Sequence, residues 1–291
     1  MANFSKTSNP SRFGDMLAED LYATGAKGQK LKDQRKKRIE WLRKKGKQDP
    51  DCIKLADKLE QCRRKHRCKS AACSECGYAG QRLVPRVPRR FLKAQTGGGK
   101  IVCVTIVPAD GLTRRGRLDE ANHFRAIRRW KDALGRAGID WFVGATDWSL
   151  NEHAKSRHRP RWSLHFYGFT ITKDLERLKK SLKEQFPNND AIPRPVKVRE
   201  WDGNKKALRY VLKPNFWRRV ATDNAERFNK KTETTRSCRA TKKERLRSRE
   251  KMELLLLLDK IGTQARLIMR FCQLINVGGT KATIVLRKPK A

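Results

Sequence analysis

Hydrophobic and polar residues alternate with two distinct periods along the central part of the chain. The segment IVCVTIV (101–107) is rich in β-branched residues and predicts a strand, and RWSLHFYGFTI (161–171) alternates as a half-buried strand does. A further strand is expected within 138–150, and the charged, proline-bearing turn at 153–161 makes it the hairpin neighbour of the segment that follows. The last strand of this region is expected over 194–201.

Helical periodicity separates these strands. Apolar residues recur near a spacing of 3.6 residues over 118–134 and 173–185, and a short helix over 204–212 is closed by Pro214. The order β-α-β-β-α-β-α is typical of an α+β fold in which an open antiparallel sheet carries its helices on one face. We therefore predict that residues 97–220 form one such domain.

The two ends of the chain have a different texture. Residues 27–47 hold eleven Lys and Arg residues, which predicts a basic helix within an N-terminal arm of residues 1–50; a solvated arm is the alternative. Residues 221–291 are expected to form a basic and helical extension. Its first part lacks a hydrophobic pattern, and its later part contains two short helices around Gly262 and a strand over 282–287.

The composition supports a folded protein without a membrane segment. Of the 291 residues 37% are hydrophobic, and seven Trp and eleven Phe residues can build a core, which excludes a wholly disordered chain. The longest aliphatic run, Leu254–Leu258, is far shorter than the roughly twenty residues that cross a bilayer, and the first residues lack an apolar signal core. We expect a cytoplasmic protein.

The charge balance indicates the class of partner. Seventy Lys and Arg residues against thirty Asp and Glu residues give a formal net charge of +40. Such a chain repels itself unless a polyanion neutralises it, and nucleic acid, DNA or RNA, is the commonest such partner; a basic ribosome-associated protein is the alternative. The side chains expected to contact DNA phosphates are Arg161, Arg218, Arg219, Lys242, Lys243 and Arg245.

A cysteine cluster lies before the first strand. Cys62, Cys68, Cys73 and Cys76 have the spacing C-x5-C-x4-C-x2-C. Reducing compartments keep thiols free, and four thiolates suit a tetrahedral Zn²⁺ site, so residues 51–96 are predicted to form a zinc-binding module. Because the C-x5-C half is irregular, His66 is an alternative ligand to Cys62 or Cys68. Ordinary cysteines in a small basic helical module are the competing interpretation.

Five polar residues of the central region can cooperate in chemistry on a phosphodiester. His165 and Tyr167 are two apart in one strand and leave the same face of the sheet, and Asp147 would join them from an adjacent strand. Tyr210 and Lys213 are i, i+3 on a short helix and point the same way. A tyrosine can attack phosphorus while a divalent cation on His and carboxylate polarises the phosphate and lysine offsets charge. A packed core histidine and tyrosine are the alternative.

The ordered motifs resemble those of a known superfamily. A basic module with C-x2-C, then VCVTIVP, GATDWSLNE, RWSLHFYG and ALRYVLKPNFWRR, span roughly residues 60–220. This set resembles the rolling-circle replication initiators and related tyrosine nickases of the HUH superfamily, in which U is a hydrophobic residue. The resemblance implies that Tyr210 is the nucleophile, Lys213 its partner and His165 the first metal-binding histidine. It also implies Mg²⁺ or Mn²⁺ as cofactor, and single-stranded or hairpin DNA at a replication origin and host replication proteins as partners.

One residue departs from the superfamily pattern. Tyr167 stands where the second metal-binding histidine belongs, and a phenol with a pKa near 10 is a poor ligand at pH 7. Asp147 falls where some members place a carboxylate, so the metal site is either rebuilt around Asp147, Glu152 or His153, or lost.

Three functions are compatible with these observations. The first is a replication initiator that nicks DNA through a phosphotyrosine intermediate. The second is a non-catalytic nucleic-acid-binding relic of the same fold, which the departure at Tyr167 favours. The third is an RNA-binding zinc-ribbon protein of the translation apparatus, which leaves the YVLK segment unexplained.

Overall fold

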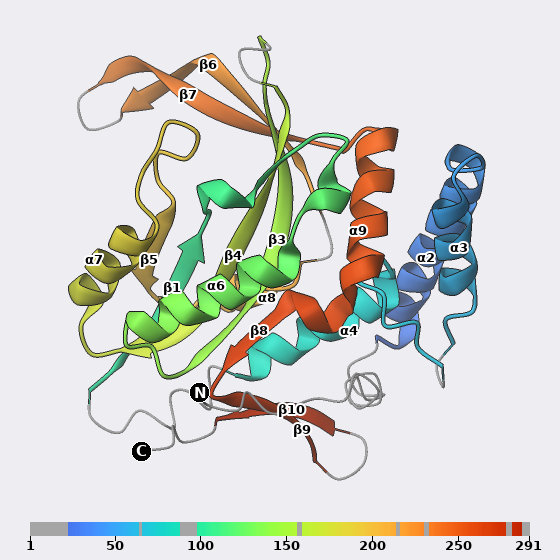
Figure 1. The fold of residues 1–291 in the computed structure, drawn as a ribbon, viewed down its shortest axis with the longest axis horizontal. Coiled ribbons are helices and arrows are strands. Elements are labelled where there is room, and N and C mark those ends of the chain that lie inside the picture. Colours follow the sequence, from blue (N-terminus) through green and yellow to red (C-terminus); the bar gives the residue numbers. More distant parts are fainter. Residues whose placement is uncertain are drawn as a thin grey trace.

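The protein is an α+β molecule built on one curled, mixed sheet (Figure 1). The structure, a computed structural model, describes residues 23–63, 66–87, 98–155, 159–213, 216–229, 233–277 and 281–286. The large sheet contains β1 (Lys100–Ile106), β2 (Leu112–Arg114), β3 (Phe142–His153), β4 (Arg161–Thr172), β5 (Val196–Glu200), β6 (Arg218–Asn229), β7 (Thr234–Glu244) and β8 (Leu267–Arg270). A separate two-stranded sheet contains β9 (Cys272–Val277) and β10 (Lys281–Leu286). The α-helices are α2 (Gly25–Lys45), α3 (Pro50–Glu60), α4 (Ser74–Leu83), α6 (His123–Arg136), α7 (Leu175–Gln185), α8 (Lys205–Tyr210) and α9 (Ser248–Arg266).

The strand order is β5-β1-β4-β3-β6-β7, with β2 paired to β4 and β8 paired to β3. The predicted hairpin of β3 and β4 is present, and the pairings among β5, β1, β4 and β3 are all antiparallel, as expected. The expectation of a purely antiparallel sheet is wrong at β6, which runs parallel to β3. Two strands share this edge of β3: β8 pairs with residues 142–145 and β6 with residues 150–153.

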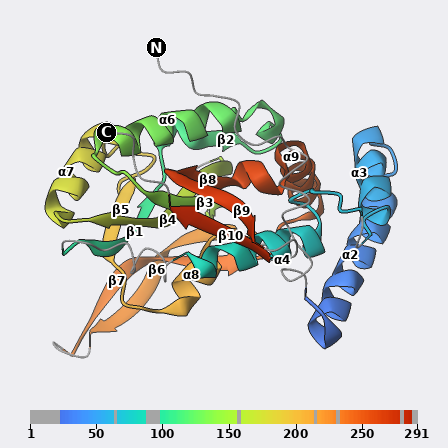
Figure 2. The ribbon, with the colours of Figure 1, turned by 90° about the horizontal axis from the view of Figure 1, so that it is seen from below.

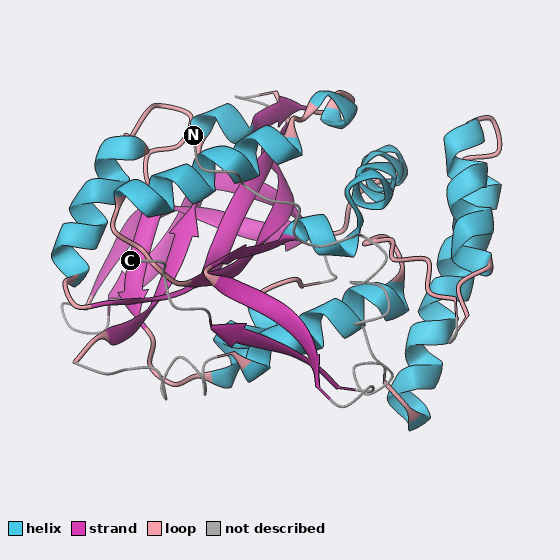
Figure 3. Cartoon of the chain, turned by 60° about the horizontal axis from the view of Figure 1, so that its bottom comes forward, coloured by secondary structure: helices cyan, strands magenta, loops and turns pink. Residues whose placement is uncertain are grey.

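Helices cover both faces of the sheet, not one as the sequence analysis predicted (Figures 2 and 3). On one face, Trp130 of α6 packs against Phe166 of β4 with ring centroids 4.9 Å apart, and α7 lies beside α6. On the other face, Val143 and Phe169 form a second apolar cluster with Leu208 of α8 and residues of α4. The reason is that β3 and β4 carry apolar side chains on both faces, so each face needs a cover.

The N-terminal helices form a pair at the side of the molecule (Figure 1). The predicted basic helix over 27–47 is confirmed as α2, and its Leu31, Ile39 and Leu42 are buried, so it is not a free solvated arm. α9 stands between this pair and the sheet, and the ammonium of Lys251 lies 4.0 Å from the ring centroid of Trp41. Each helix in the described part of the chain is too short or too polar to cross a bilayer.

The C-terminal region differs from the predicted basic and helical extension. It begins with the long antiparallel hairpin of β6 and β7. This hairpin could not be predicted, because the segment lacks the apolar alternation that marks a half-buried strand. The two short helices expected around Gly262 within 251–272 are confirmed as far as Arg266, as the two parts of α9, which bends at Gly262 with φ of 69°. The expected helix is wrong beyond Arg266, where Leu267–Arg270 form β8. The final strand is confirmed as β10.

Candidate active site and metal centre

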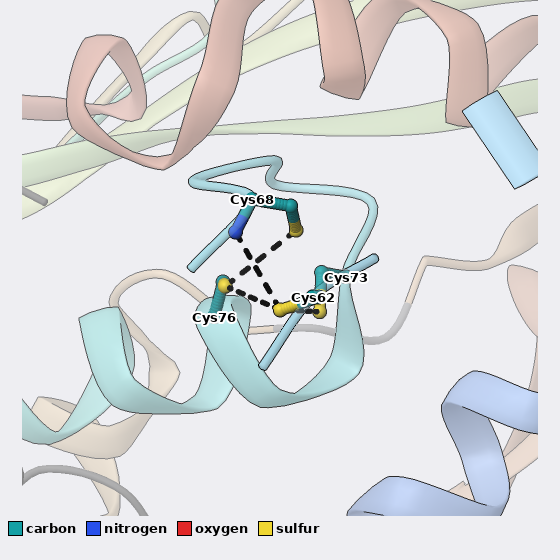
Figure 4. Close-up of side chains that lie close together, drawn as sticks. All are labelled: Cys62, Cys68, Cys73 and Cys76. Carbon is teal, nitrogen blue, oxygen red and sulfur yellow. Dashed lines mark hydrogen bonds between the residues drawn. The ribbon is translucent and has the colours of Figure 1, made fainter. Parts of the chain in front are cut away.

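The four clustered cysteines converge on one point (Figure 4). Their sulfur atoms all lie within 4.8 Å of one another, and three of the Sγ–Sγ distances are 3.7, 3.8 and 3.9 Å. A tetrahedral Zn²⁺ site with Zn–S bonds of about 2.3 Å has sulfurs about 3.8 Å apart. The cluster therefore has the dimensions of a site that could hold a metal ion such as zinc.

Two local structures bring these sulfurs together. Cys73 is the N-cap of α4 and Cys76 lies in its first turn, while Cys62 follows α3. The amide of Cys68 donates to Sγ of Cys62 at 3.5 Å. His66 is exposed and takes no part, so the alternative in which it replaces a cysteine is wrong.

Without a metal, the four sulfurs cannot all carry a negative charge. Hydrogen bonds from the neighbouring thiols, that of Cys68 first, lower the pKa of Cys62, whereas the same contact with Cys62 raises the pKa of Cys68. The thiolate of Cys62 is stabilised, and its negative charge makes deprotonation of Cys68 less favourable. A divalent cation would remove this conflict, because thiolates are the metal-binding form.

A second polar cluster lies on the sheet face covered by α8. Asp147 and His165 are directly opposite each other on β3 and β4, so their side chains leave the same face, as the sequence predicted. Tyr167 follows on this face, and its ring meets that of Tyr210 edge-on with centroids 5.2 Å apart. α8 holds Tyr210 over the sheet because Asn204 caps its first turn and Leu208 is buried beneath it.

Lys213 connects the carboxylate to the exposed tyrosine. Its Nζ lies 2.6 Å from Oδ2 of Asp147 and donates to Oη of Tyr210 at 3.0 Å. Burial acts to lower the pKa of Lys213, but Asp147 and Tyr210 outweigh it and the pKa is raised, so the ammonium form is held. Tyr210 is 40% exposed, which leaves its ring open to a partner.

His165 and Tyr167 are in surroundings that favour their neutral forms. Nε2 of His165 lies 2.9 Å from Oγ of Ser149. Burial lowers the pKa of His165 to about 4; Asp147 opposes this shift, and the cations Arg219 and Lys213 add to it. Burial also raises the pKa of Tyr167, with the neighbouring Cys103 as the next contribution. Tyr167 is therefore a neutral phenol at physiological pH.

Arg266 is a site residue that the sequence analysis missed. It is 1% exposed, and its guanidinium donates to the carbonyl oxygen of Thr146 at 3.2 and 3.3 Å and to that of Lys213 at 3.3 Å. It fills the stretch of the β3 edge between β8 and β6. Burial lowers the pKa of Arg266 to about 10, against the attraction of Asp147. Arg266 is 53 residues from Lys213 in the sequence and belongs to no motif, so no sequence pattern predicts that it lies here.

The residues around Asp147 do not fit a catalytic Mg²⁺ or Mn²⁺ ion. Within the part of the chain that is described, the cysteine cluster is the only group of three or more His, Cys, Asp or Glu ligand atoms that converge. Glu152, one possible substitute ligand, pairs instead with Arg218 and Arg247. His153, the other, forms no such group with Asp147 and His165. Two protein donors, one of them an ion-paired carboxylate, are a poor set for a hard cation.

Several expected DNA-binding residues form a row across the sheet. Arg161 pairs in register with Arg114 of β2 and with Asn151 of β3, Asn151 pairs with Arg219, and Arg219 pairs with Lys243. Residues opposite each other share a face, so these four cations lie on the face of Asp147 and His165. Arg161 lies four residues before His165 on β4, so the row is separated from the pair of Asp147 and His165 by roughly 13 Å, at 3.3 Å per residue. Arg114 was not expected from the sequence.

The other expected DNA contacts are placed differently. Arg218 is on the opposite face, where its guanidinium pairs with Glu152 and Glu244 and is largely buried. Lys242 also points to that face, and Arg245 is exposed after the end of β7. Arg218 is thus held in an ion-pair network.

In comparisons with known proteins, no family model, no curated protein and no solved structure matches the chain.

Proposed function

We propose that this protein binds DNA and cleaves single-stranded or hairpin DNA by transferring a strand to Tyr210, as an initiator of rolling-circle replication would. The observation that carries the proposal is the contact between Lys213 Nζ and Tyr210 Oη at 3.0 Å, beside an exposed tyrosine ring. The ordered motifs that resemble HUH nickases place the nucleophile and its lysine at these same two positions. Tyr210 is exposed, whereas Tyr78, which also lies beside an ammonium, that of Lys27, and Tyr167 are partly buried.

The reaction is a transesterification that needs no change of oxidation state. Oη of Tyr210 forms a bond to phosphorus and gives up its proton, and the bond from phosphorus to the 3′ oxygen breaks. The 3′ oxygen takes up a proton as it leaves, so the products are a 5′-phosphotyrosine and a free 3′-hydroxyl. The ammonium of Lys213 stabilises the negative charge that develops on the phosphate.

The row of Arg114, Arg161, Arg219 and Lys243 supports a nucleic-acid substrate at this face. Cations of this kind contact phosphates and supply affinity without reading the sequence. A DNA strand that crosses the row lies about 13 Å from Asp147 along the direction of the β-strands. Phosphate contacts there would position the DNA for attack.

We also propose that the cysteine cluster holds a structural Zn²⁺ ion. The sulfur distances of 3.7 to 3.9 Å match a tetrahedral site whose four ligands all come from the protein, which leaves no open position for catalysis.

A specific observation favours a second candidate, a DNA-binding protein that does not cut. Asp147 is occupied by Lys213, and Tyr167 stands in place of a metal-binding histidine. If cleavage by this protein required the catalytic divalent cation of the superfamily, the protein would bind DNA without cleaving it.

Covalent capture separates the two candidates. The protein is incubated with a pool of end-labelled single-stranded and hairpin DNAs, and a denaturing gel detects protein joined to DNA. We expect an adduct that Tyr210→Phe abolishes while DNA binding persists. Tyr78→Phe, a tyrosine of α4 in the cysteine module, is the matched control and should cut normally. Tight binding with no adduct would reject cleavage and favour the second candidate.

A further inference from the structure

We propose that the ammonium of Lys213 takes the place of the catalytic divalent cation, so that strand cleavage by this protein requires no Mg²⁺ or Mn²⁺. The inference rests on the proposed function for its catalytic consequence. Its structural part, that the site of Asp147 and His165 does not bind a divalent cation, can be tested without any cleavage.

The ligand atoms that a metal would need are already engaged. Oδ2 of Asp147 is 2.6 Å from the ammonium of Lys213, and Nε2 of His165 is 2.9 Å from Oγ of Ser149. The remaining carboxylate oxygen, Oδ1 of Asp147, is buried and accepts no hydrogen bond from the described residues. One open oxygen on a carboxylate that an ammonium already neutralises is a weak site for a hard cation.

The surrounding charge also opposes a divalent cation. Lys213 is in contact with Asp147, the buried Arg266 interacts with Asp147 electrostatically, and Arg219 interacts with His165. Two cations thus act on one carboxylate and a third acts on the adjacent His165, a local surplus of about two positive charges. A further +2 ion here would be repelled by cations that are fixed: Arg266 is held by the carbonyl oxygens of Thr146 and Lys213.

Lys213 can do at this position what the metal would do. An ammonium has three hydrogens to donate, and in the described chain those of Lys213 meet Asp147 and Tyr210, which leaves one for a non-bridging phosphate oxygen. The lysine would thus hold the phosphate against the tyrosine oxygen and neutralise charge in the transition state. Tyr167 stands where the superfamily has a metal ligand, and its partly buried, neutral phenol instead places a ring against that of Tyr210.

The first experiment measures Mn²⁺ binding by electron paramagnetic resonance on the full-length protein. Zinc content is determined in each sample, so that ions on the cysteine cluster are accounted for. We expect no bound Mn²⁺ at millimolar concentration in the native protein. The variant Tyr167→His/Lys213→Met restores a His-x-His pair and frees Asp147, and it should bind one Mn²⁺ ion; Tyr167→His alone serves as the intermediate case. One stoichiometric Mn²⁺ ion in the native protein, lost in His165→Ala, would overturn the inference.

The second experiment measures adduct formation in buffer freed of divalent cations by a chelating resin, because a soluble chelator would also strip zinc. We expect the initial rate to change less than about twofold when Mg²⁺ or Mn²⁺ is added, which is less than 0.5 kcal/mol in the barrier. Cleavage that occurs only after metal is added would refute the inference and leave the proposed function standing. Absence of an adduct under every condition would refute the proposed function, and the Mn²⁺ measurement would still decide whether the site takes a metal.

Discussion

The backbone amide of Thr263 donates a hydrogen bond to the carbonyl oxygen of Lys69 at 3.0 Å. This contact joins the bend of α9 to the cysteine loop, because Lys69 directly follows Cys68. One turn further along α9, Arg266 binds the carbonyl oxygen of Lys213 at 3.3 Å. α4, whose N-cap and first turn supply Cys73 and Cys76, also contacts α8 through Nε2 of Gln81, which donates to the carbonyl oxygen of Arg209. A Cβ at Gly80 would lie 3.7 Å from a methyl carbon of Leu212, two residues after α8 ends. The metal cluster and the Tyr210–Lys213 pair are thus connected through two helices.

Loss of the metal from the cysteine cluster should therefore destabilise the whole molecule. We expect Cys73→Ser to remove the zinc and to lower the melting temperature by more than about 5 °C, since 1 kcal/mol shifts the midpoint of a 150–250-residue protein by about 2–4 °C. Calorimetry together with metal analysis makes the measurement. Cys52→Ser is the control, because Cys52 is a buried cysteine outside the cluster. A zinc-free Cys73→Ser protein that melts with the native protein would contradict a structural role.

The cationic row predicts a difference between two adjacent residues. Lys243 lies on the face of Asp147 and Lys242 on the opposite face, and both are exposed. Lys243→Ala should weaken binding to single-stranded DNA and reduce the slope of log affinity against log salt by about 0.7, the value for one phosphate contact. Lys242→Ala should leave the slope unchanged. Fluorescence anisotropy across a salt series makes the measurement, and equal effects of the two substitutions would refute binding along this row.

Arg218 should behave as a structural residue instead. Its guanidinium is largely buried between Glu152 and Glu244, so Arg218→Ala removes the shared cation from both carboxylates and leaves Glu152 with Arg247 and Glu244 with Lys242. Breaking a buried pair typically costs about 3–5 kcal/mol. We expect denaturant unfolding to show a loss of this order, with no change in the salt dependence of DNA binding. The opposite pattern, a native stability with a reduced salt slope, would make Arg218 a phosphate contact.

Two buried histidines predict a loss of stability in mild acid. Burial lowers the pKa of both His165 and His123 to about 4, against a usual value of 6.5. Between pH 6.5 and 4 these histidines are protonated in the unfolded chain and neutral in the folded protein. Their contribution to the free energy of unfolding is therefore constant above pH 6.5 and falls between pH 6.5 and 4. Each histidine contributes up to about 3 kcal/mol at 1.36 kcal/mol per pKa unit. His123→Gln should flatten this part of the profile, and an unchanged slope would show that His123 is not protonated on unfolding.

Much of the central fold and of the site could be predicted because local patterns determine it. Alternation placed β3 and β4 as neighbours, and the same period-2 rule put His165 and Tyr167 on one face. Tyr210 and Lys213 meet because they are close in sequence, but the expected helical i, i+3 geometry is wrong: α8 ends at Tyr210 and Leu212 has a φ of 56°. The cysteine spacing brought four sulfurs together. In each case the residues that meet are close in sequence or lie in neighbouring strands.

The parts that could not be predicted depend on long-range packing. The hairpin of β6 and β7 lacks an apolar stripe, so no period marks it. Arg266 reaches Thr146 across 120 residues, and its buried position follows from the gap that β8 and β6 leave on the edge of β3. The ion pair between Lys213 and Asp147, on which the proposed metal-free site depends, likewise follows from long-range contacts. Gln81 of α4 donates to the carbonyl oxygen of Arg209, and Arg266 of α9 donates to that of Lys213.

The most direct test of the account is to identify the amino acid that carries the DNA. The protein is incubated with single-stranded DNA, the adduct is digested with protease and nuclease, and mass spectrometry locates the residual nucleotide on a peptide. The account predicts a phosphodiester on Tyr210, with a free 3′-hydroxyl on the released strand. A nucleotide on Tyr167, on Tyr78 or on a serine, or complete absence of an adduct from a protein that binds DNA tightly, would contradict it.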